Sequence, residues 1–192
     1  EKINAIAQSL SSKAINSIHK SSKKISNSQH KKMKTTNLKI SVITPSFNSE
    51  KYIKDTVNSV KQQSYPAYEH IIIDGASTDN TLNILKSQQN IKLISEPDNG
   101  QSHAINKGFQ IAKGDIIAWI NSDDYYYDEN VFDKVIEAFE KNKDAKIIIG
   151  DCLFTYEGIK PDLPVKNRPY DFDHTLRYWR NFVPPTQPSI FF

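Results

Sequence analysis

Two adjacent carboxylates, Asp123 and Asp124, directly follow an apolar run at residues 116–120. The length and composition of this run are typical of a strand buried on both faces. Neighbouring carboxylates at the end of such a strand repel each other and are costly to remove from water. A divalent cation that also holds a phosphate group would balance their charge. A polar turn that caps a helix starting near Glu129 explains the same residues equally well, so the surrounding elements must decide.

The segments around this acidic pair alternate between strand and helix patterns. Strands are expected at residues 38–44, 70–74, 91–95, 116–120, 146–150 with a continuation to 156, and 189–192, and helices at 49–63, 81–88, 101–113, 129–142 and 172–179. Pro45 is expected to end the first strand and Gly114 the third helix, while Pro161, Pro164 and Pro169 mark loops. This alternation predicts an α/β fold with a parallel sheet and helices on both faces.

Polar side chains follow the predicted strands at the points where these end. They are Thr44, Ser46 and Asn48 after the first strand, Asp74 at the end of the second, and Glu96, Asp98 and Asn99 after the third. Ligands of such sheets bind outside the carboxyl ends of the strands, and acids gathered there indicate a metal–nucleotide site. The sequence contains neither of the two common glycine-rich phosphate loops, so a metal is expected to neutralise the phosphates.

Charge divides the sequence into a basic leader and an acidic body. Residues 1–37 hold eight Lys and one Glu, a net charge of +7, whereas residues 38–192 have a net charge of −4. A nucleic-acid-binding domain would carry its basic patch on the folded body, so this class is excluded. The sequence shows no membrane-spanning run or signal peptide, and its single cysteine, Cys152, is typical of a reducing compartment. We therefore expect a cytoplasmic protein, with the inner face of a membrane as an alternative location.

The leader at residues 1–37 carries a thin apolar stripe to about residue 20. It is interpreted as a solvated linker, and the alternative is a basic helix that contacts another domain, another subunit or an anionic membrane. The chain starts at Glu1 and has its only methionine at Met33. We expect a piece of a longer protein, with one domain at residues 38–192 that folds without the leader.

Three motifs occur in the order TPSFN, DGASTDNT and SDD, each after an apolar strand pattern. From about Lys39 to the final PPTQPSIFF, the sequence resembles the family 2 glycosyltransferases of GT-A fold. The resemblance implies a Mn²⁺- or Mg²⁺-dependent enzyme that transfers a sugar with inversion. The donor would be a UDP-, GDP- or dTDP-sugar, and the acceptor a hydroxyl of a carbohydrate or glycolipid.

The resemblance also implies roles for individual residues. Nucleotide binding would fall to Thr44, Pro45, Ser46, Phe47, Asp74 and Asp123. Asp124 would bind the metal directly, and Asp123 would contact the ribose or a metal-bound water. Asn121 stands where many relatives carry another Asp, and Ile105 where many carry an Arg, which leaves Lys107 to contact the diphosphate.

The general base that inversion requires is not evident before Phe192. Asp151 is the candidate within the chain, and the family usually supplies this acid after the strand that SIFF would begin. We therefore expect the chain to bind donor but to transfer sugar slowly, so the alternative is a nucleotide-sugar-binding domain without turnover. A nucleotidyltransferase is disfavoured because TPSFNSE is not its glycine-rich loop. The tyrosines at 125–127 either stack on a sugar or cover the sheet edge, and His70 and Trp119 are expected to be structural.

Overall fold

The computed structural model describes residues 37–156, 159–165 and 187–192. The leader, interpreted as a linker with a basic helix as the alternative, and the helix expected at 172–179 both lie outside these ranges. Within them, no helix is both long enough and apolar enough to cross a membrane.

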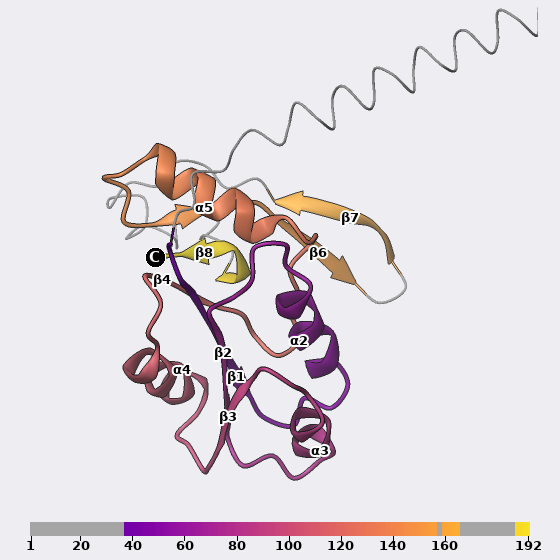
Figure 1. Cartoon of the computed structure of the whole chain (residues 1–192). Coiled ribbons are helices and arrows are strands. Elements are labelled where there is room, and N and C mark those ends of the chain that lie inside the picture. Colours follow the sequence, from indigo (N-terminus) through magenta and orange to yellow (C-terminus); the bar gives the residue numbers. More distant parts are fainter. Residues whose placement is uncertain (1–36, 157–158, 166–186) are drawn as a thin grey trace, which may run out of the picture. The chain divides into compact units, whose positions relative to one another are not determined.

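A six-stranded sheet forms the centre of the fold, with the strand order β3-β2-β1-β4-β8-β5 (Figure 1). The strands are β1 (Ile40–Ser46), β2 (Glu69–Asp74), β3 (Lys92–Ser95), β4 (Ile116–Trp119), β5 (Ile148–Ile149) and β8 (Ile190–Phe191). The first four are parallel, and β8 pairs antiparallel with both β4 and β5. The α/β prediction is therefore confirmed, with a mostly parallel sheet into which one antiparallel strand is inserted.

Helices cover both faces of this sheet (Figure 1). They are α2 (Ile53–Lys61), α3 (Thr81–Lys86), α4 (Gln101–Ile111) and α5 (Val131–Lys141). Successive strand residues point to opposite faces, so β1 serves two cores. Ile40 and Val42 pack in one core with α5, whereas Ile43 packs in the other with Ala104 of α4. The alternation in a single strand thus joins the two layers of helices.

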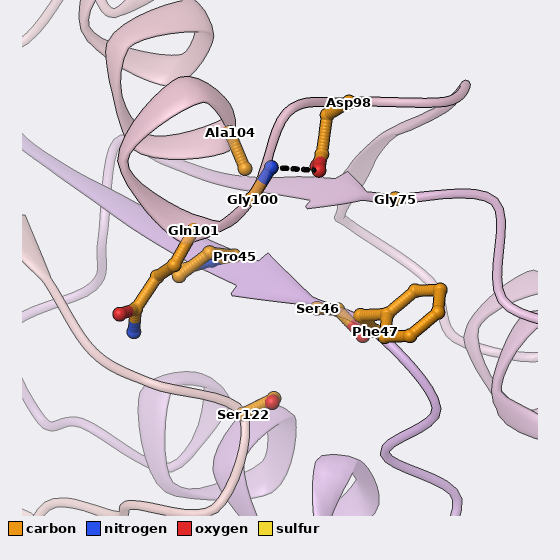
Figure 2. Close-up of a pocket in the computed structure, with 9 residues that line it drawn as sticks. All are labelled: Pro45, Ser46, Phe47, Gly75, Asp98, Gly100, Gln101, Ala104 and Ser122. Atoms are coloured by element: carbon orange, nitrogen blue, oxygen red, sulfur yellow. Dashed lines mark hydrogen bonds between the residues drawn. The ribbon is translucent and has the colours of Figure 1, made fainter.

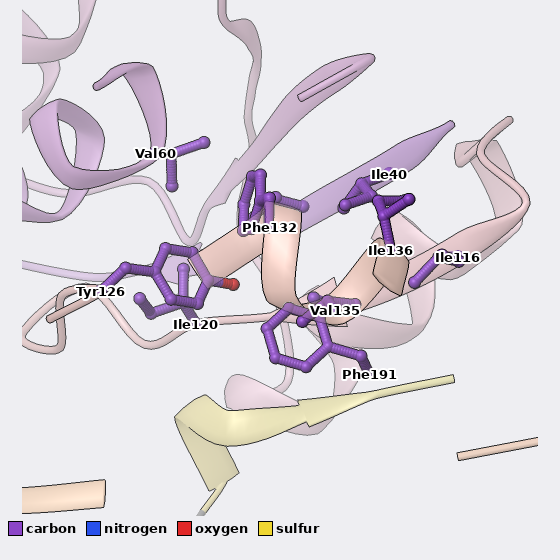
Figure 3. Packing of buried hydrophobic residues seen from close by; sticks show 11 residues of the cluster. Ile40, Val60, Ile116, Ile120, Tyr126, Phe132, Val135, Ile136 and Phe191 are labelled. Carbon is purple, nitrogen blue, oxygen red and sulfur yellow. The ribbon is translucent and has the colours of Figure 1, made fainter. Parts of the chain in front are cut away.

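Aromatic side chains fill the core beneath α5 (Figure 3). The ring of Tyr126 packs edge-on against Phe132, with 4.9 Å between centroids, and stacks on Phe191 at 6.0 Å. On the opposite face, Phe192 meets the rings of Phe109 and Trp119. Phe191 and Phe192 therefore place their rings on opposite sides of the sheet, and Phe191 is the buried one of the two.

Strand β1 continues through Pro45, which corrects the prediction that this proline ends it. Ile43 directs its backbone toward β4, where its carbonyl accepts the N–H of Ile120. Pro45 lies two residues further on and faces the same way, beyond the end of β4 at Trp119. Since no strand lies opposite at that point, the missing N–H of proline costs no ladder hydrogen bond.

Two glycines set how closely α4 and its C-terminal turn approach β1. A Cβ on Gly108 would lie 2.5 Å from Cγ2 of Ile43, and one on Gly114 would lie 2.6 Å from the backbone N of Ser41. Helix α4 ends at Ile111, before Gly114, and its C-cap is Ala112 in an extended conformation. Gly114 is therefore required for close backbone approach, and the prediction that it ends the helix is wrong.

A second, two-stranded sheet pairs β6 (Cys152–Tyr156) with β7 (Ile159–Val165) in antiparallel register. β6 confirms the predicted continuation to residue 156, but β7 contains Pro161 and Pro164, which were expected to mark loops. Each strand of a two-stranded sheet has one unpaired side, where a residue without an N–H is tolerated. Proline is also tolerated at irregularities in strand pairing, and the register of β6 with β7 shifts between Phe154 and Tyr156.

Candidate functional site

An open pocket of about 420 Å³ lies at the carboxyl ends of the parallel strands (Figure 2). It is lined by Pro45, Ser46, Phe47, Gly75, Asp98, Gly100, Gln101, Ala104 and Ser122. These residues come from the ends of β1 and β2, the loop between β3 and α4, the start of α4, and the turn after β4. Of the polar residues predicted at the strand ends, Ser46 and Asp98 line this pocket, whereas Thr44 and Asp74 are fully buried.

One side of the pocket combines an aromatic ring with a carboxylate. Phe47 is 62 % exposed although it is a large apolar side chain. Asp98 accepts the N–H of Gly100 at Oδ1 over 2.8 Å, and its Oδ2 has no partner in the described part of the chain. A Cβ on Gly75 would lie 3.0 Å from this Oδ2, so the absence of a side chain there makes room for the carboxylate. A flat ring and a hydrogen-bond acceptor are the groups that a nucleobase requires.

Asp74 lies below the pocket and has no exposed surface. Its carboxylate accepts hydrogen bonds from the N–H of Ser77 at 2.9 Å, from the hydroxyl of Ser95 at 2.9 Å and from the hydroxyl of Ser77. Ala76, inside this turn, adopts a φ of 61°, which side chains rarely favour. Asp74 therefore holds the turn that carries Gly75, whereas the N-cap of α3 is Asn80.

Thr44 is also fully buried, and its hydroxyl lies 2.9 Å from Nε2 of His70. Burial lowers the pKa of His70 to about 4, because the charged imidazolium would lose its hydration. The histidine is therefore neutral at pH 7. The Thr44–His70 pair joins β1 to β2 beneath the pocket, and His70 has the structural role expected of it.

The acidic pair lies on the turn that follows β4. Asp123 is exposed, whereas Asp124 is half-buried and accepts the side-chain N–H of Asn121 at Oδ2 over 3.1 Å. Burial raises the pKa of the Asp124 carboxyl, the charge of Asp123 raises it further, and the Asn121 hydrogen bond opposes both. The backbone carbonyl of Asp124 accepts the hydroxyl of Thr56, which fixes the turn on α2.

Two side-chain contacts connect this acidic turn to its surroundings. Gln101, the first residue of α4, donates from Nε2 to Oδ1 of Asn121 over 2.7 Å. The hydroxyls of Ser122 and Ser49 lie 2.7 Å apart. Gln101 and Ser122 both line the pocket. The turn that carries Asp123 and Asp124 is therefore held in contact with the pocket wall.

Lys107 forms an ion pair with Glu96, with 2.7 Å between Nζ and Oε1, and lowers the pKa of that glutamate. Lys107 does not line the pocket, and among the residues that the structure describes no Lys or Arg does. Asp151 is exposed and follows β5. Since β5 runs parallel to β4, Asp151 lies at the same edge of the sheet as the acidic pair.

The three consecutive tyrosines have different environments. Tyr126 is a core residue with 7 % exposure, whereas Tyr125 and Tyr127 are 54 % and 75 % exposed. The buried ring anchors the turn after the acids, and the exposed rings on either side are available to a ligand. Tyr126 therefore belongs to the core, and stacking on a sugar stays a prediction for Tyr125 and Tyr127.

No role for Gln101 or Ser122 was evident from the sequence, and Asp98 was identified only as a polar residue after a strand. The position of Gln101 could have indicated a role, because it begins the helix that follows the third strand, at the carboxyl edge of the sheet. Gln101 is a polar, uncharged residue, and its place in the pocket wall and its hydrogen bond to Asn121 distinguish it from an ordinary first-turn side chain.

A mostly parallel sheet with this pocket defines the class, an α/β protein of GT-A fold. The family model for glycosyl transferase family 2 matches residues 41–189, and the chain belongs to this family.

Among curated relatives, the chain is 37 % identical over 128 residues to TuaG of Bacillus subtilis, a glycosyltransferase whose name assigns it provisionally to teichuronic acid biosynthesis. That match covers 64 % of this chain and 50 % of TuaG. It is 31 % identical over 118 residues to the poly(ribitol-phosphate) β-N-acetylglucosaminyltransferase TarS of Staphylococcus aureus, covering 58 % and 21 % of the two chains. The chain thus spans half or less of the length of these two relatives.

The solved structure of TarS residues 1–349 with UDP-GlcNAc aligns with a TM-score of 0.53 and 28 % identity, over 58 % of this chain and 34 % of that one. A mannosyltransferase of Pyrobaculum calidifontis, solved with GDP-Man and Mn²⁺, shares the fold at a TM-score of 0.50 and 23 % identity, over 55 % and 33 % of the chains.

Proposed function

We propose that this chain is the donor-binding domain of a metal-dependent glycosyltransferase. The enzyme would transfer a sugar from a nucleotide-sugar to an acceptor hydroxyl with inversion. One observation carries the proposal: the described residues that line the pocket at the carboxyl edge include no Lys or Arg, and the pocket adjoins two carboxylates. A nucleoside diphosphate is itself an anion, so it would be repelled unless a divalent cation accompanied it.

The described residues fit a cation that is shared with a ligand. They contain no group of three or more His, Cys, Asp or Glu that could hold a metal alone. Asp124, however, carries a charge that burial and Asp123 both disfavour, and a cation would relieve it. Mn²⁺ or Mg²⁺ is bound in this way by one or two carboxylates together with phosphate oxygens. Such an ion would supply electrostatic stabilisation of the diphosphate leaving group.

The other residues would orient the donor around this ion. The exposed ring of Phe47 would stack on the base, and Oδ2 of Asp98 would accept its N–H or a ribose hydroxyl. Asp74 would act from below by fixing the turn at Gly75. The TarS structure with UDP-GlcNAc and the mannosyltransferase structure with GDP-Man support a UDP- or GDP-sugar as donor.

The acceptor would approach from the open side of the pocket. A carbohydrate or glycolipid is proposed, since rings such as those of Tyr125 and Tyr127 stack well on sugars. Asp151 lies at the appropriate edge of the sheet for a general base. The second candidate function is donor binding without turnover. It is favoured because Asp151, the candidate general base, is not among the residues that line the pocket.

Calorimetric titration of UDP, GDP and dTDP, each with Mn²⁺, Mg²⁺ or EDTA, tests the proposal. Binding is expected with the metals and not with EDTA, and Asp124→Asn should abolish most of that difference. Asp144→Asn is the matched control, because Asp144 is an exposed acid that precedes β5 and so lies at the opposite sheet edge. Equal affinity with and without metal would contradict the proposal. Transfer assays on the same chain then separate the enzyme from the binding domain.

A further inference from the structure

Three side chains form a continuous hydrogen-bonded chain from the pocket wall to the acidic turn. Gln101 donates to Asn121 over 2.7 Å, and Asn121 donates to Asp124 over 3.1 Å. The backbone N–H of Asp124 also bonds the carbonyl of Asn121 at 3.2 Å, so the two residues are held at both backbone and side chain. Asn121 is therefore an integral part of the acidic turn.

The direction of every donor in this chain is fixed by the carboxylate. An ionised Asp124 can only accept, so the NH₂ group of Asn121 must face it. The amide oxygen of Asn121 then faces Gln101, which must donate through its own NH₂ group. Neither amide can rotate by half a turn without losing a hydrogen bond. As a result, Gln101 determines which end of the Asn121 side chain reaches Asp124.

This arrangement treats the two oxygens of Asp124 differently. Oδ2 receives the Asn121 hydrogen bond, while Oδ1 has no partner within the described ranges. A cation that approaches Asp124 therefore meets one oxygen already engaged and one that is available. Binding through a single oxygen suits the near-octahedral shells of small ions such as Mg²⁺. Ca²⁺ has a larger and more flexible shell and readily takes both oxygens of a carboxylate.

We infer that Asn121 and Gln101 are positioning residues that restrict Asp124 to single-oxygen coordination and so select small divalent ions over Ca²⁺. The inference rests on the proposed metal-dependent donor binding. It gives Asn121 a role of its own, because an aspartate at this position would have no N–H to donate to Oδ2. The residue is thus a determinant of ion selectivity.

The experiment measures the dissociation constant of UDP in the presence of Mn²⁺ and, separately, of Ca²⁺, for the full chain and its variants. Asn121→Ala should weaken Mn²⁺-supported binding by about ten- to a hundredfold, the usual effect of removing a partner of a metal ligand. Ca²⁺-supported binding should weaken less or improve, because Oδ2 becomes available. The ratio of the two constants should therefore shift toward Ca²⁺.

Gln101→Ala provides a second variant that leaves the acidic turn itself intact, since Gln101 is exposed. It should shift the ratio in the same direction by a smaller factor. Gln110→Ala is the matched control, because Gln110 is an exposed glutamine on the same helix. Electron paramagnetic resonance of Mn²⁺ titrated into the chain with UDP gives a second readout, independent of activity.

The outcomes separate this inference from the proposed function. If the unmodified chain binds UDP no better with Mn²⁺ than with EDTA, both are wrong. If it shows metal-dependent binding and the Mn²⁺/Ca²⁺ ratio is the same in all variants, only the positioning role is wrong. A shift in Asn121→Ala and Gln101→Ala, with no shift in Gln110→Ala, supports it. A simple loss of folding would lower the affinity with both ions together and lower the melting temperature, which also contradicts the inference.

Discussion

Replacement of His70 by glutamine should remove a large part of the acid sensitivity of this fold. His70 is 4 % exposed, and its pKa falls to about 4 because burial disfavours the charged ring. The unfolded chain would protonate it near the ordinary value of 6.5. Between these two pH values the unfolded state binds more protons than the folded state, so stability declines as the pH falls.

The size of the effect follows from the two pKa values. The His70 contribution is complete above pH 6.5, is lost as the pH falls through about 4, and amounts to about 3 kcal/mol. About 2 kcal/mol of this should be lost between pH 7.5 and pH 5. For a domain with a typical stability of about 5–15 kcal/mol, that loss is readily measured.

Urea unfolding at pH 7.5, 6 and 5 is the assay, with the free energy of unfolding of each chain plotted against pH. His70→Gln stays neutral at every pH and can still hydrogen-bond Thr44, so its plot should be flatter by about 2 kcal/mol over this range. The comparison uses slopes because the substitution also changes packing. Parallel plots would refute the argument, because they would mean that His70 is protonated equally in the folded and unfolded states.

Three further predictions concern packing and the pocket floor. Gly108→Ala places a methyl group against Ile43 and should lower the free energy of unfolding in urea by about 1–3 kcal/mol, despite the better helix propensity of alanine. A more stable variant would show that α4 can move away from β1. Tyr126→Phe removes a buried hydroxyl that has no partner among the described residues, so the melting temperature should stay the same or rise, and a large fall would reveal a missing partner. Asp74→Ala leaves the Ser77 N–H unpaired and should cost about 1–3 kcal/mol of stability and weaken UDP binding, whereas unchanged affinity in a folded variant would limit Asp74 to a structural role.

The sequence predicted the fold and the location of the site well, because both depend on local patterns. The apolar runs and helix periodicities recovered β1 to β4 and α2 to α5 to within a few residues, and the polar residues at strand ends identified the carboxyl edge. The pairing of β8 between β4 and β5 could not be read in this way, since it depends on contacts between distant segments.

The predictions that failed or were incomplete depend on tertiary neighbours. Pro45 continues a strand because β4 has already ended beside it. At position 114 a glycine is required because the backbone there approaches β1 too closely for a side chain. The hydrogen bond of Asp74 to Ser95 and the ion pair of Lys107 with Glu96 could not be predicted from the sequence either, because these partners are distant in the chain. The Gln101–Asn121 contact joins residues 20 positions apart and has no sequence signature.

The insertion of β8 has a consequence for the order in which the sheet assembles. Strand β5 pairs with β8 and with no other strand in the described ranges, and the β4–β8 contact joins Ala118 to Phe191. Closing so long a stretch of chain is entropically unfavourable and slow, whereas the neighbouring pairs β1–β2 and β2–β3 close short loops. The described residues that line the pocket all lie between positions 45 and 122. During synthesis, these lining elements can therefore form while β8 is still to be made, and pulsed hydrogen exchange should show β1 and β2 protected before β5.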